Sequence, residues 1–259
     1  MKVVILCGGR GSRLREETEF RPKPLIPIGQ KPILWHIMKS YSQYNHNEFI
    51  LALGYKGDLI KEYFMHYRWK ISDFTLNIRK HDIKYHDYLA LEDWNITFAD
   101  TGLESMTAKR LAKLKRYLTD EDNFMLTYGD GVSDIDIDKL VAFHKEKGRI
   151  VTITGYNPTS AYGVIEVKDG IAKEFKEKPE SQDIINGGFM VLNKKIFDYV
   201  SEENDVMLVE TVLPQLAKEG QVATYHHKGF WHSMDTYRDY LKLNKMWDEK
   251  KSPWKTWKD

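Results

Sequence analysis

The sequence predicts an α/β fold with a mostly parallel central sheet between helices, built as one domain with a small inserted β-rich subdomain. Three features lead to this prediction. A short β-branched run near the N-terminus leads into a glycine-rich loop, further short apolar runs alternate with amphipathic helical segments, and a polar, aromatic stretch around 70–105 interrupts the alternation. The order strand, helix, strand, helix implies parallel strands joined by right-handed crossovers.

The N-terminal part of the chain supplies this alternation. Residues 3–6 are β-branched and apolar, as in a strand that is buried on both faces. Glycines follow, and prolines at 22, 24, 27 and 32 keep the next stretch from forming a helix. Apolar residues recur with helical spacing from Ile33 to Tyr41 and again within 58–67, and the apolar run at 49–53 between them indicates a second strand.

The rest of the chain resumes the pattern after the excursion, in which 75–78 and 95–99 are strand-like. An Asp169-Gly170 pair between two apolar runs predicts a hairpin of 164–167 with 171–175. The other expected elements are strands at 123–128, 150–156, 189–192 and 222–226, and helices at 107–118, 137–147, 206–217 and 236–247. The tail at 248–259 is irregular and aromatic. Because nothing resembles a flexible linker, residues 1–259 are expected to form a single domain.

Composition and charge narrow the function. Lys and Arg number 39 and Asp and Glu number 38, so the formal net charge is +1. A chain without a basic field is not expected to bind nucleic acid or an anionic membrane. No apolar run approaches the ~20 residues that span a bilayer. The single cysteine, Cys7, excludes an intramolecular disulfide and fits a cytoplasmic protein.

The loop after the first strand is the first candidate site. Its glycines at 8, 9 and 11 let backbone N–H groups approach a polyphosphate. The third glycine of the dinucleotide fingerprint is replaced by Leu14, and the Gly-Lys-Ser/Thr of a P-loop is absent. Arg13 can fork onto phosphate oxygens, and Lys23 projects from a stiff segment between Pro22 and Pro24. A tight turn with solvated cations is the structural alternative.

Two aspartates are candidate metal ligands. Asp130 lies between glycines just past a predicted parallel strand, which is where open α/β sheets bind ligands. Its carboxylate is a hard oxygen ligand of the kind that Mg²⁺ takes, although Asp-Gly is also a common turn. Asp235 directly precedes the last predicted helix, so it is either a second metal ligand or only the N-cap of that helix.

A further charged segment follows the predicted hairpin. Glu177 could bind sugar hydroxyls and Lys178 a monophosphate, with Asn186-Gly187-Gly188 shortly after them. A charged hairpin exit is the alternative interpretation. The nine His show no metal-binding spacing, and Cys7 is expected to be a small buried hydrophobe rather than a nucleophile.

Taken together, these motifs resemble those of the sugar nucleotidyltransferases. The resemblance rests first on Leu6-x-Gly8-Gly9-x-Gly11-x-Arg13-Leu14 followed by Pro22-Lys23-Pro24. It extends over the whole chain, and the 70–105 excursion and the Trp-rich tail are similar to the cytidylyl branch. The family pattern Thr-Gly-Gly-Arg is replaced here by Thr107-Ala108-Lys109-Arg110. The family's Phe-Gly-Ala-Leu-Asp is replaced by Tyr162-Gly163-Val164-Ile165-Glu166.

The resemblance implies a Rossmann-like three-layer sandwich with a mixed, mostly parallel sheet, and a homo-oligomer, typically a hexamer. It implies Mg²⁺ as cofactor and CTP and α-D-glucose 1-phosphate as substrates, giving CDP-glucose for deoxysugars of surface polysaccharides such as O-antigen. The implied catalytic residues are Arg13, Lys23 and Asp130, and the implied metal ligands are Asp130 and Asp235. The nucleotide site would comprise Leu6, Gly8, Gly9, Arg10, Gly11, Ser12, Arg13, Lys23, Ser105, Arg110 and Asp130. The sugar phosphate site would comprise Tyr128, Gly163, Glu177, Lys178, Asn186 and Gly188.

Three alternatives remain open from the sequence. The enzyme could be a cytidylyltransferase that acts on a different sugar or phosphorylated acceptor. An NAD-dependent oxidoreductase could use the same strand and glycine loop, although its third glycine and its acidic ribose ligand are not clearly placed. A non-catalytic nucleotide-sugar-binding protein could share the fold, because a fold does not determine a function.

Overall fold

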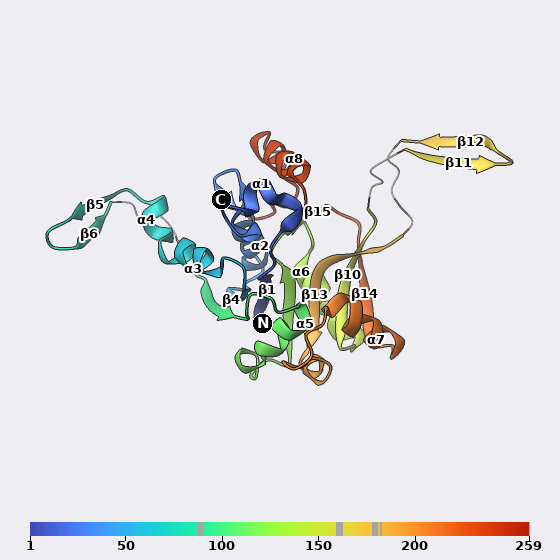
Figure 1. The fold of residues 1–259 in the computed structure, drawn as a ribbon, viewed down its shortest axis with the longest axis horizontal. Helices are drawn as coiled ribbons and strands as arrows, with labels where there is room; N and C mark the ends of the chain where they lie inside the picture. Colours follow the sequence, from blue (N-terminus) through green and yellow to red (C-terminus); the bar gives the residue numbers. More distant parts are fainter. Residues whose placement is uncertain (87–90, 159–162, 178–180, 182, 259) are drawn as a thin grey trace.

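The computed structural model describes residues 1–86, 91–158, 163–177, 181 and 183–258 (Figure 1). Its strands are β1 (Val3–Cys7), β2 (Pro27–Ile28), β3 (Lys31–Pro32), β4 (Glu48–Leu53), β5 (Phe74–Asn77), β6 (Asp82–Tyr85), β7 (Asn95–Asp100), β8 (Asn123–Tyr128), β9 (Gly131–Ser133), β10 (Val151–Tyr156), β11 (Val164–Lys168), β12 (Ile171–Lys176), β13 (Ile185–Asn193), β14 (Val222–His227) and β15 (Trp231–Ser233). Its α-helices are α1 (Arg15–Thr18), α2 (Ile33–Ser42), α3 (Gly57–Met65), α4 (Tyr67–Ile71), α5 (Thr107–Lys113), α6 (Ile137–Lys147), α7 (Leu213–Lys218) and α8 (Tyr237–Asp248). Shorter turns are η1 (Ser12–Leu14), η2 (Lys23–Leu25), η3 (Lys115–Tyr117), η4 (Lys194–Asp198) and the π-helical η5 (Leu208–Val212).

A seven-stranded sheet in the order β14-β10-β13-β8-β1-β4-β7 forms the centre of the molecule. Strand β1 pairs in parallel with β4 and β8, whereas β13 runs antiparallel to its neighbours β8 and β10. The mixed, mostly parallel sheet predicted for the chain is confirmed. Its carboxyl edge collects the loops that follow β1, β4, β7 and β8, which is where such sheets bind ligands.

Helices cover both faces of the sheet, as the three-layer prediction requires (Figure 1). Along β1, alternate residues point to opposite faces: Val3 and Ile5 join a core with α2, α6 and the C-terminal tail, whereas Val4 and Leu6 join a core with α5 and α7. Both sets are nearly inaccessible to solvent. A strand buried on both faces needs a continuous apolar run, which explains why residues 3–7 contain no polar side chain.

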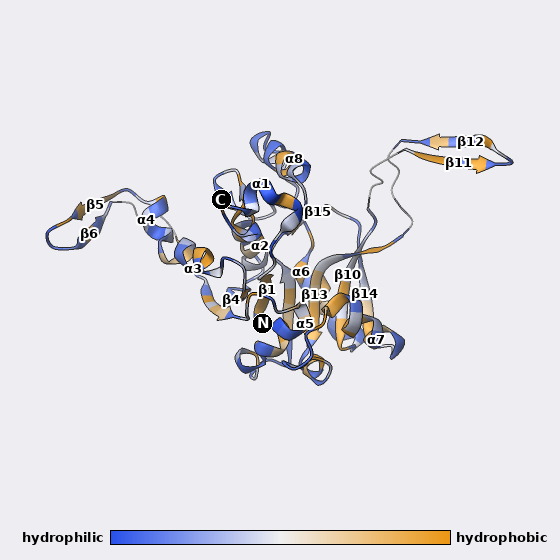
Figure 2. Cartoon of the chain, in the orientation of Figure 1, coloured by the Kyte–Doolittle hydropathy of each residue, from blue (hydrophilic) through white to orange (hydrophobic). Residues whose placement is uncertain are grey.

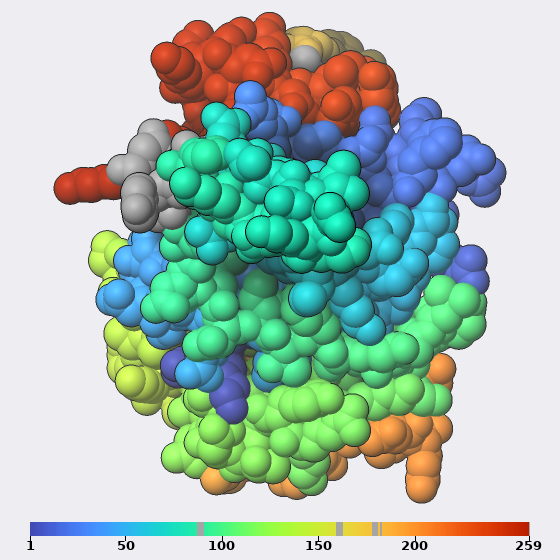
Figure 3. Space-filling view, turned by 90° about the vertical axis from the view of Figure 1, so that its left-hand side faces the viewer, coloured from blue at the N-terminus to red at the C-terminus, as the bar shows by residue number. Residues whose placement is uncertain are grey.

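Two hairpins project from this body. Hairpin β5–β6 extends from α4, and hairpin β11–β12 extends from the opposite side (Figure 1). Asp169 and Gly170 at the tip of the second hairpin have φ of 52° and 76°, so the turn predicted from this Asp-Gly pair is confirmed. Figure 2 shows apolar residues on both hairpins, and Figure 3 views the molecule from the side of β5–β6. Ile165 and Phe175 of the second hairpin are 53% and 62% exposed.

Two boundaries differ from the sequence prediction. The excursion is narrower than expected, because β7 returns to the main sheet as its edge strand beside β4. The helix expected over 206–217 begins instead with the π-helical turn η5, and α-helix starts only at Leu213. Pro214 at the start of α7 has no N–H to donate to the preceding turn, which explains the change of helix type there.

The aromatic tail packs against the body. Trp254 and Trp257 are 1% and 7% exposed, and Trp254 stacks on Trp247 of α8. These rings surround His36 of α2, which is fully buried. His36 Nε2 lies 3.0 Å from the Ile28 carbonyl, and the Trp254 indole N–H donates to His36 Nδ1 at 3.5 Å. A neutral imidazole satisfies both contacts, with Nε2 as donor and Nδ1 as acceptor.

This arrangement predicts acid sensitivity. Burial lowers the pKa of His36 from its ordinary 6.5 to about 4. The unfolded chain therefore binds more protons than the folded one between these values. The stability that neutral His36 contributes is complete above pH 6.5, and it falls by about 1.4 kcal/mol per pH unit as the pH drops toward 4.

The measurement is the urea midpoint of unfolding, followed by tryptophan fluorescence between pH 7 and pH 4. The variant His36→Gln cannot titrate and is expected to lose part of this pH dependence, although its stability at pH 7 is lower. If the urea midpoint of His36→Gln fell with decreasing pH as steeply as that of the unmodified protein, His36 would not be the cause of the acid sensitivity.

Within the described part of the chain, every helix is too short or too polar to cross a bilayer.

Candidate active site

A cavity of about 460 Å³ lies at the carboxyl edge of the central sheet. It contains every residue predicted for the nucleotide and metal sites. Its lining is Leu6, Cys7, Gly8, Gly9, Arg10, Gly11, Ser12, Arg13, Lys23, Pro24, Leu103, Glu104, Ser105, Met106, Thr107, Arg110, Tyr128, Gly129, Asp130, Met207 and Asp235. A larger hollow of about 850 Å³ lies around Asn123 and Asn193 and contains none of the predicted site residues.

The glycine loop after β1 forms the floor of this cavity. Gly11 has φ of 62°, and a Cβ there would lie 2.8 Å from the side chain of Thr18. Gly8 is needed for another reason, because a Cβ at this position would lie 2.2 Å from Arg110 Nη1. The glycines therefore allow both the turn of the loop and the close passage of a guanidinium.

Arg110 is 4% exposed, and its guanidinium binds oxygen atoms of the protein. Its Nη1 donates to Thr101 Oγ1 at 2.7 Å and to the Gly102 carbonyl at 2.8 Å, and its Nη2 donates to the Gly8 carbonyl at 3.1 Å. Further bonds go to the carbonyls of Leu53 and Leu103. Arg110 thus joins the loops that follow β1, β4 and β7. Its direct contact with a nucleotide, like that of Ser105, stays a prediction.

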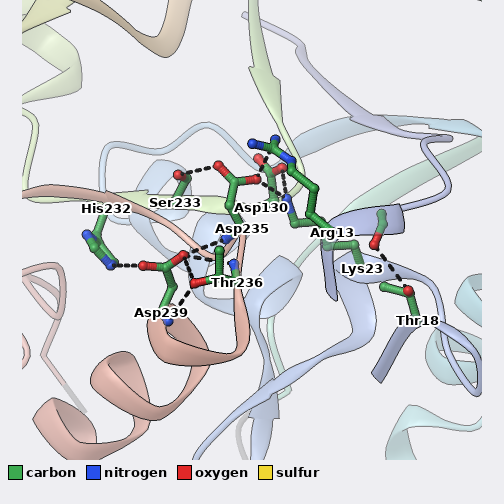
Figure 4. A network of polar contacts seen from close by, with 10 residues as sticks. Arg13, Thr18, Lys23, Asp130, His232, Ser233, Asp235, Thr236 and Asp239 are labelled. Carbon is green, nitrogen blue, oxygen red and sulfur yellow. Dashed lines mark hydrogen bonds and ion pairs between the residues drawn. The ribbon is translucent and has the colours of Figure 1, made fainter. Parts of the chain in front are cut away.

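The charged end of the cavity contains Arg13, Lys23, Asp130 and Asp235 (Figure 4). Lys23 Nζ lies 2.6 Å from Asp130 Oδ2 and 2.6 Å from Asp235 Oδ1. Arg13 Nη2 donates to the same Asp235 oxygen at 2.9 Å. Two cationic side chains thus meet at the Asp235 carboxylate, which comes from a distant part of the sequence.

Local backbone pairing brings the two aspartates together. Strand β9 follows Asp130 and pairs with β15, so that Gly131 faces Ser233. The Met234 N–H donates to the Asp130 carbonyl at 2.8 Å, which fixes the next residue, Asp235, beside Asp130. Glycine at 129 lets the segment that carries Lys23 pack closely against the same loop, because a Cβ there would lie 3.0 Å from Pro24 Cγ.

The environment keeps Lys23 and Asp235 ionised. Burial lowers the pKa of Lys23, but the carboxylates of Asp130 and Asp235 outweigh this effect, so its pKa is raised above the ordinary value. For Asp235, burial raises the pKa, and the hydrogen bond and charge of Lys23 outweigh it, so the net pKa is lowered. A charged ammonium between two aspartates is therefore the state at neutral pH.

Asp235 is not the N-cap of α8. The cap is Thr236, whose hydroxyl accepts from the Asp239 N–H while the Asp239 carboxylate accepts from the Thr236 N–H. This reciprocal capping box satisfies the helix start without Asp235. The Asp235 carboxylate, which instead accepts from Ser233, Arg13 and Lys23, faces the cavity.

The two carboxylates fit a divalent cation that is otherwise held by phosphate oxygens and water. Both already bind one cationic atom, Lys23 Nζ, at 2.6 Å. Among the described residues there is no group of three His, Cys, Asp or Glu that could enclose an ion. Mg²⁺ is commonly held by one or two carboxylates together with substrate phosphates, so a pair of aspartates is the expected donor set.

The residues predicted for the sugar phosphate fall into two groups. Tyr128 and Gly188 are adjacent, since a Cβ on Gly188 would lie 2.9 Å from Tyr128 Cδ2, and Asn186 accepts from the Gly188 N–H. Burial, followed by the charge of Asp130, raises the pKa of Tyr128 to about 12, so its hydroxyl stays neutral.

The second group lies at the open end of the β11–β12 hairpin. A Cβ on Gly163 would lie 3.1 Å from Glu177 Oε2, so these two residues are neighbours. Neither lines the cavity. Lys178 lies outside the described residues, as does residue 162 of the motif that contains Gly163. The structure thus places Tyr128 beside Gly188 and Gly163 beside Glu177. That both pairs bind the sugar phosphate stays a prediction.

Some lining residues were not predicted from the sequence. Leu103, Met106 and Met207 are the apolar residues among them, and no motif singles them out. Cys7 also lines the cavity, but it is 1% exposed and burial raises the pKa of its thiol. The prediction that Cys7 is a buried hydrophobe rather than a nucleophile agrees with this position.

Comparison with known proteins identifies the family. The family model described as nucleotidyl transferase matches residues 2–250. The chain belongs to the nucleotidyl transferase family. It is 48% identical over 257 residues to a protein of Bacillus subtilis (strain 168) named "Probable glucose-1-phosphate cytidylyltransferase", covering 99% of this chain and 100% of that protein. It is 43% identical over 258 residues to the glucose-1-phosphate cytidylyltransferase of Salmonella typhimurium (strain LT2), covering 99% and 100%.

A solved structure agrees with the architecture. HddC from Yersinia pseudotuberculosis is 21% identical, and the superposition covers 95% of this chain and 99% of that one with a TM-score of 0.69. At this identity the likeness concerns the fold, and it confirms the predicted mixed sheet between helices.

Proposed function

We propose that this nucleotidyl transferase is a Mg²⁺-dependent glucose-1-phosphate cytidylyltransferase, which makes CDP-glucose and pyrophosphate from CTP and α-D-glucose 1-phosphate. The observation that carries the proposal is the position of Lys23 Nζ, 2.6 Å from the carboxylates of both Asp130 and Asp235 in a glycine-floored cavity. Relatives of 48% and 43% identity bear the name of this activity. CDP-glucose would then supply deoxysugars for surface polysaccharides such as O-antigen.

The reaction requires little acid–base chemistry. An oxygen of the sugar phosphate attacks the α-phosphorus of CTP, a new P–O bond forms, and the bond from the α-phosphorus to the β-phosphate oxygen breaks. Pyrophosphate leaves with the electron pair, and no proton has to be removed because the attacking phosphate is already ionised. The work of the protein is then to position the two substrates and to offset their negative charge.

The residues of the charged end fit these tasks. Arg13 is 74% exposed at its side chain and can turn its fork toward a phosphate, whereas Lys23 is 12% exposed and held in a proline-framed turn. The loop of Gly8, Gly9 and Gly11 offers backbone N–H groups to the triphosphate. Asp130 and Asp235 would hold Mg²⁺, which when bound supplies further positive charge at the phosphates.

The test is pyrophosphate release in the presence of Mg²⁺, with glucose 1-phosphate against CTP, UTP, dTTP, ATP and GTP. We expect release with CTP to exceed release with each of the others by at least tenfold. Release that is fastest with another nucleotide would contradict the cytidylyl assignment. Release with CTP only when glucose 1-phosphate is replaced by another phosphorylated acceptor would contradict the assignment of the sugar.

We also propose that the protein is a cytoplasmic homo-oligomer, a hexamer on the family resemblance. A two-stranded hairpin is marginally stable alone, and the exposed apolar side chains of β11 and β12, such as Val167 and Ile171 at 60% and 62%, are suited to contact another copy. Sedimentation equilibrium is expected to give six times the chain mass of 30.5 kDa. A monomer at micromolar concentration would contradict this part of the proposal.

A further inference from the structure

The cavity changes character from one end to the other. Its charged end, with Lys23 and the two aspartates, suits phosphates and a metal. Its other end consists of the segment after β7 and the start of α5, which contribute the apolar Leu103 and Met106 beside Glu104 and Ser105. Met207 lies next to this segment, because its sulfur contacts the Thr107 hydroxyl. A nucleoside triphosphate has the same polarity, since a flat and weakly polar base is joined to a highly charged tail. The base therefore belongs at the end that contains Met207.

Met207 comes to the cavity from a distant segment, which is fixed against α5 on both sides of it. The Ala108 N–H donates to the Val206 carbonyl at 3.1 Å, and the Leu208 N–H donates to Thr107 Oγ1 at 2.8 Å. Asp205 adds a third bond, because its carboxylate accepts from the Met106 N–H at 2.7 Å. The backbone of Met207 is thus held between two anchored neighbours.

Packing and helix geometry fix the same segment. Leu208 is fully buried in the core between α5 and the sheet, so Met207 could leave the cavity only if Leu208 left the core. Met207 is the N-cap of the π-helical turn η5, and its carbonyl accepts from the Thr211 N–H at 3.1 Å. Single π-helical turns occur frequently at functional sites, where they redirect a side chain. Its sulfur accepts from the Thr107 hydroxyl at 3.9 Å, which limits its rotamers.

We infer that Met207 forms one wall of the nucleobase site, with its thioether against the face of the base. This inference rests on the proposed function for the identity of the nucleotide, but it concerns binding and not turnover. A thioether is flexible and polarisable, and it makes favourable contacts with aromatic rings. Thr107 and Asp205 act as positioning residues, because their hydrogen bonds to the backbone of Leu208 and Met106 hold the segment that carries Met207.

The test compares two ligands that share the phosphates and differ in the base. Titration calorimetry with Mg²⁺ measures the Kd of a nucleoside triphosphate and of inorganic tripolyphosphate, without sugar phosphate. The nucleotide is whichever of CTP, UTP, dTTP, ATP and GTP the unmodified protein binds most tightly. Met207→Ala is expected to raise the Kd of the nucleotide about tenfold and to leave that of tripolyphosphate unchanged.

Three further variants make the comparison decisive. Met207→Leu keeps the apolar volume and is expected to stay within about threefold of the unmodified protein. Met65→Ala, at a side chain that is 76% exposed on α3, is the matched control and should change neither Kd. Lys23→Ala should weaken both ligands, because both carry phosphates.

The inference is overturned if Met207→Ala binds the nucleotide as tightly as the unmodified protein, or if it loses nucleotide and tripolyphosphate equally. It is also overturned if none of the five nucleotides binds more tightly than tripolyphosphate. Failure of the proposed function has a different signature. The unmodified protein would then bind its preferred nucleotide in a Met207-dependent manner but would release no pyrophosphate with glucose 1-phosphate.

Discussion

Replacing Lys23 by alanine is expected to lower kcat/KM for pyrophosphate release by at least ~100-fold, the scale of losing one preorganised electrostatic group. Lys23 is the cation nearest to both aspartates, its side chain is 12% exposed, and its raised pKa keeps it charged at neutral pH. A buried charge at a fixed position stabilises the phosphates more than a solvated one does, because solvent does not have to reorganise around it.

The substitution also leaves two aspartates facing each other without their shared partner. The pKa of Asp235, which Lys23 helps to lower, should therefore rise in Lys23→Ala, and the acid limb of the pH profile of kcat/KM should move to higher pH. Lys245→Ala, at a side chain that is 76% exposed on α8, is the control and should behave as the unmodified enzyme. A kcat/KM within a few-fold of the unmodified value would remove Lys23 from the site.

Asp130→Asn is expected to lower kcat/KM by at least ~100-fold and to raise the Mg²⁺ concentration needed for half-maximal rate. Asparagine has the same shape as aspartate, and its side-chain oxygen can still accept a hydrogen bond from Lys23. It lacks the negative charge that a divalent cation requires. The backbone of Asp130 accepts from Met234 and is untouched by the change, so Asp235 should stay in place.

The measurement for Asp130→Asn is the initial rate as a function of Mg²⁺ at saturating CTP. Asp120→Asn is the matched control, because Asp120 is a 68% exposed aspartate that pairs with Lys2 away from the cavity. If Asp130→Asn required no more Mg²⁺ than the control did, Asp130 would not be a metal ligand.

Much of the fold could be predicted because buried elements and tight turns each require particular residue types at neighbouring positions. The strand at residues 3–7 is apolar throughout since it is buried on both faces, and the hairpin around Asp169-Gly170 is set by the φ values that this turn demands. The position of β7 could not be predicted in this way. Its six residues mix polar and apolar side chains as those of β5 and β6 do, and only pairing with β4 assigns it to the main sheet.

The separate motifs of the candidate site could be predicted from the sequence, but their proximity in the folded protein could not. Nothing near Asp130 or Asp235 in the sequence reveals that they are adjacent, because the pairing of β9 with β15 involves only three residues on each strand. Arg110 was singled out by its family motif, yet its bonds to the Gly8 and Gly102 carbonyls are visible only in the structure. Met207 has no sequence signal at all, because an isolated methionine is most often a core residue.

The central claim is that one site joins CTP to a sugar 1-phosphate by attack at the α-phosphorus. Isotope tracing tests this claim most directly. Glucose 1-phosphate would carry ¹⁸O in its three non-bridging phosphate oxygens, and the products would be analysed by ³¹P NMR and mass spectrometry. The account predicts that CDP-glucose retains all of the label and that an equal amount of unlabelled pyrophosphate is formed. Label in pyrophosphate or in inorganic phosphate, or release of pyrophosphate without CDP-glucose, would contradict it.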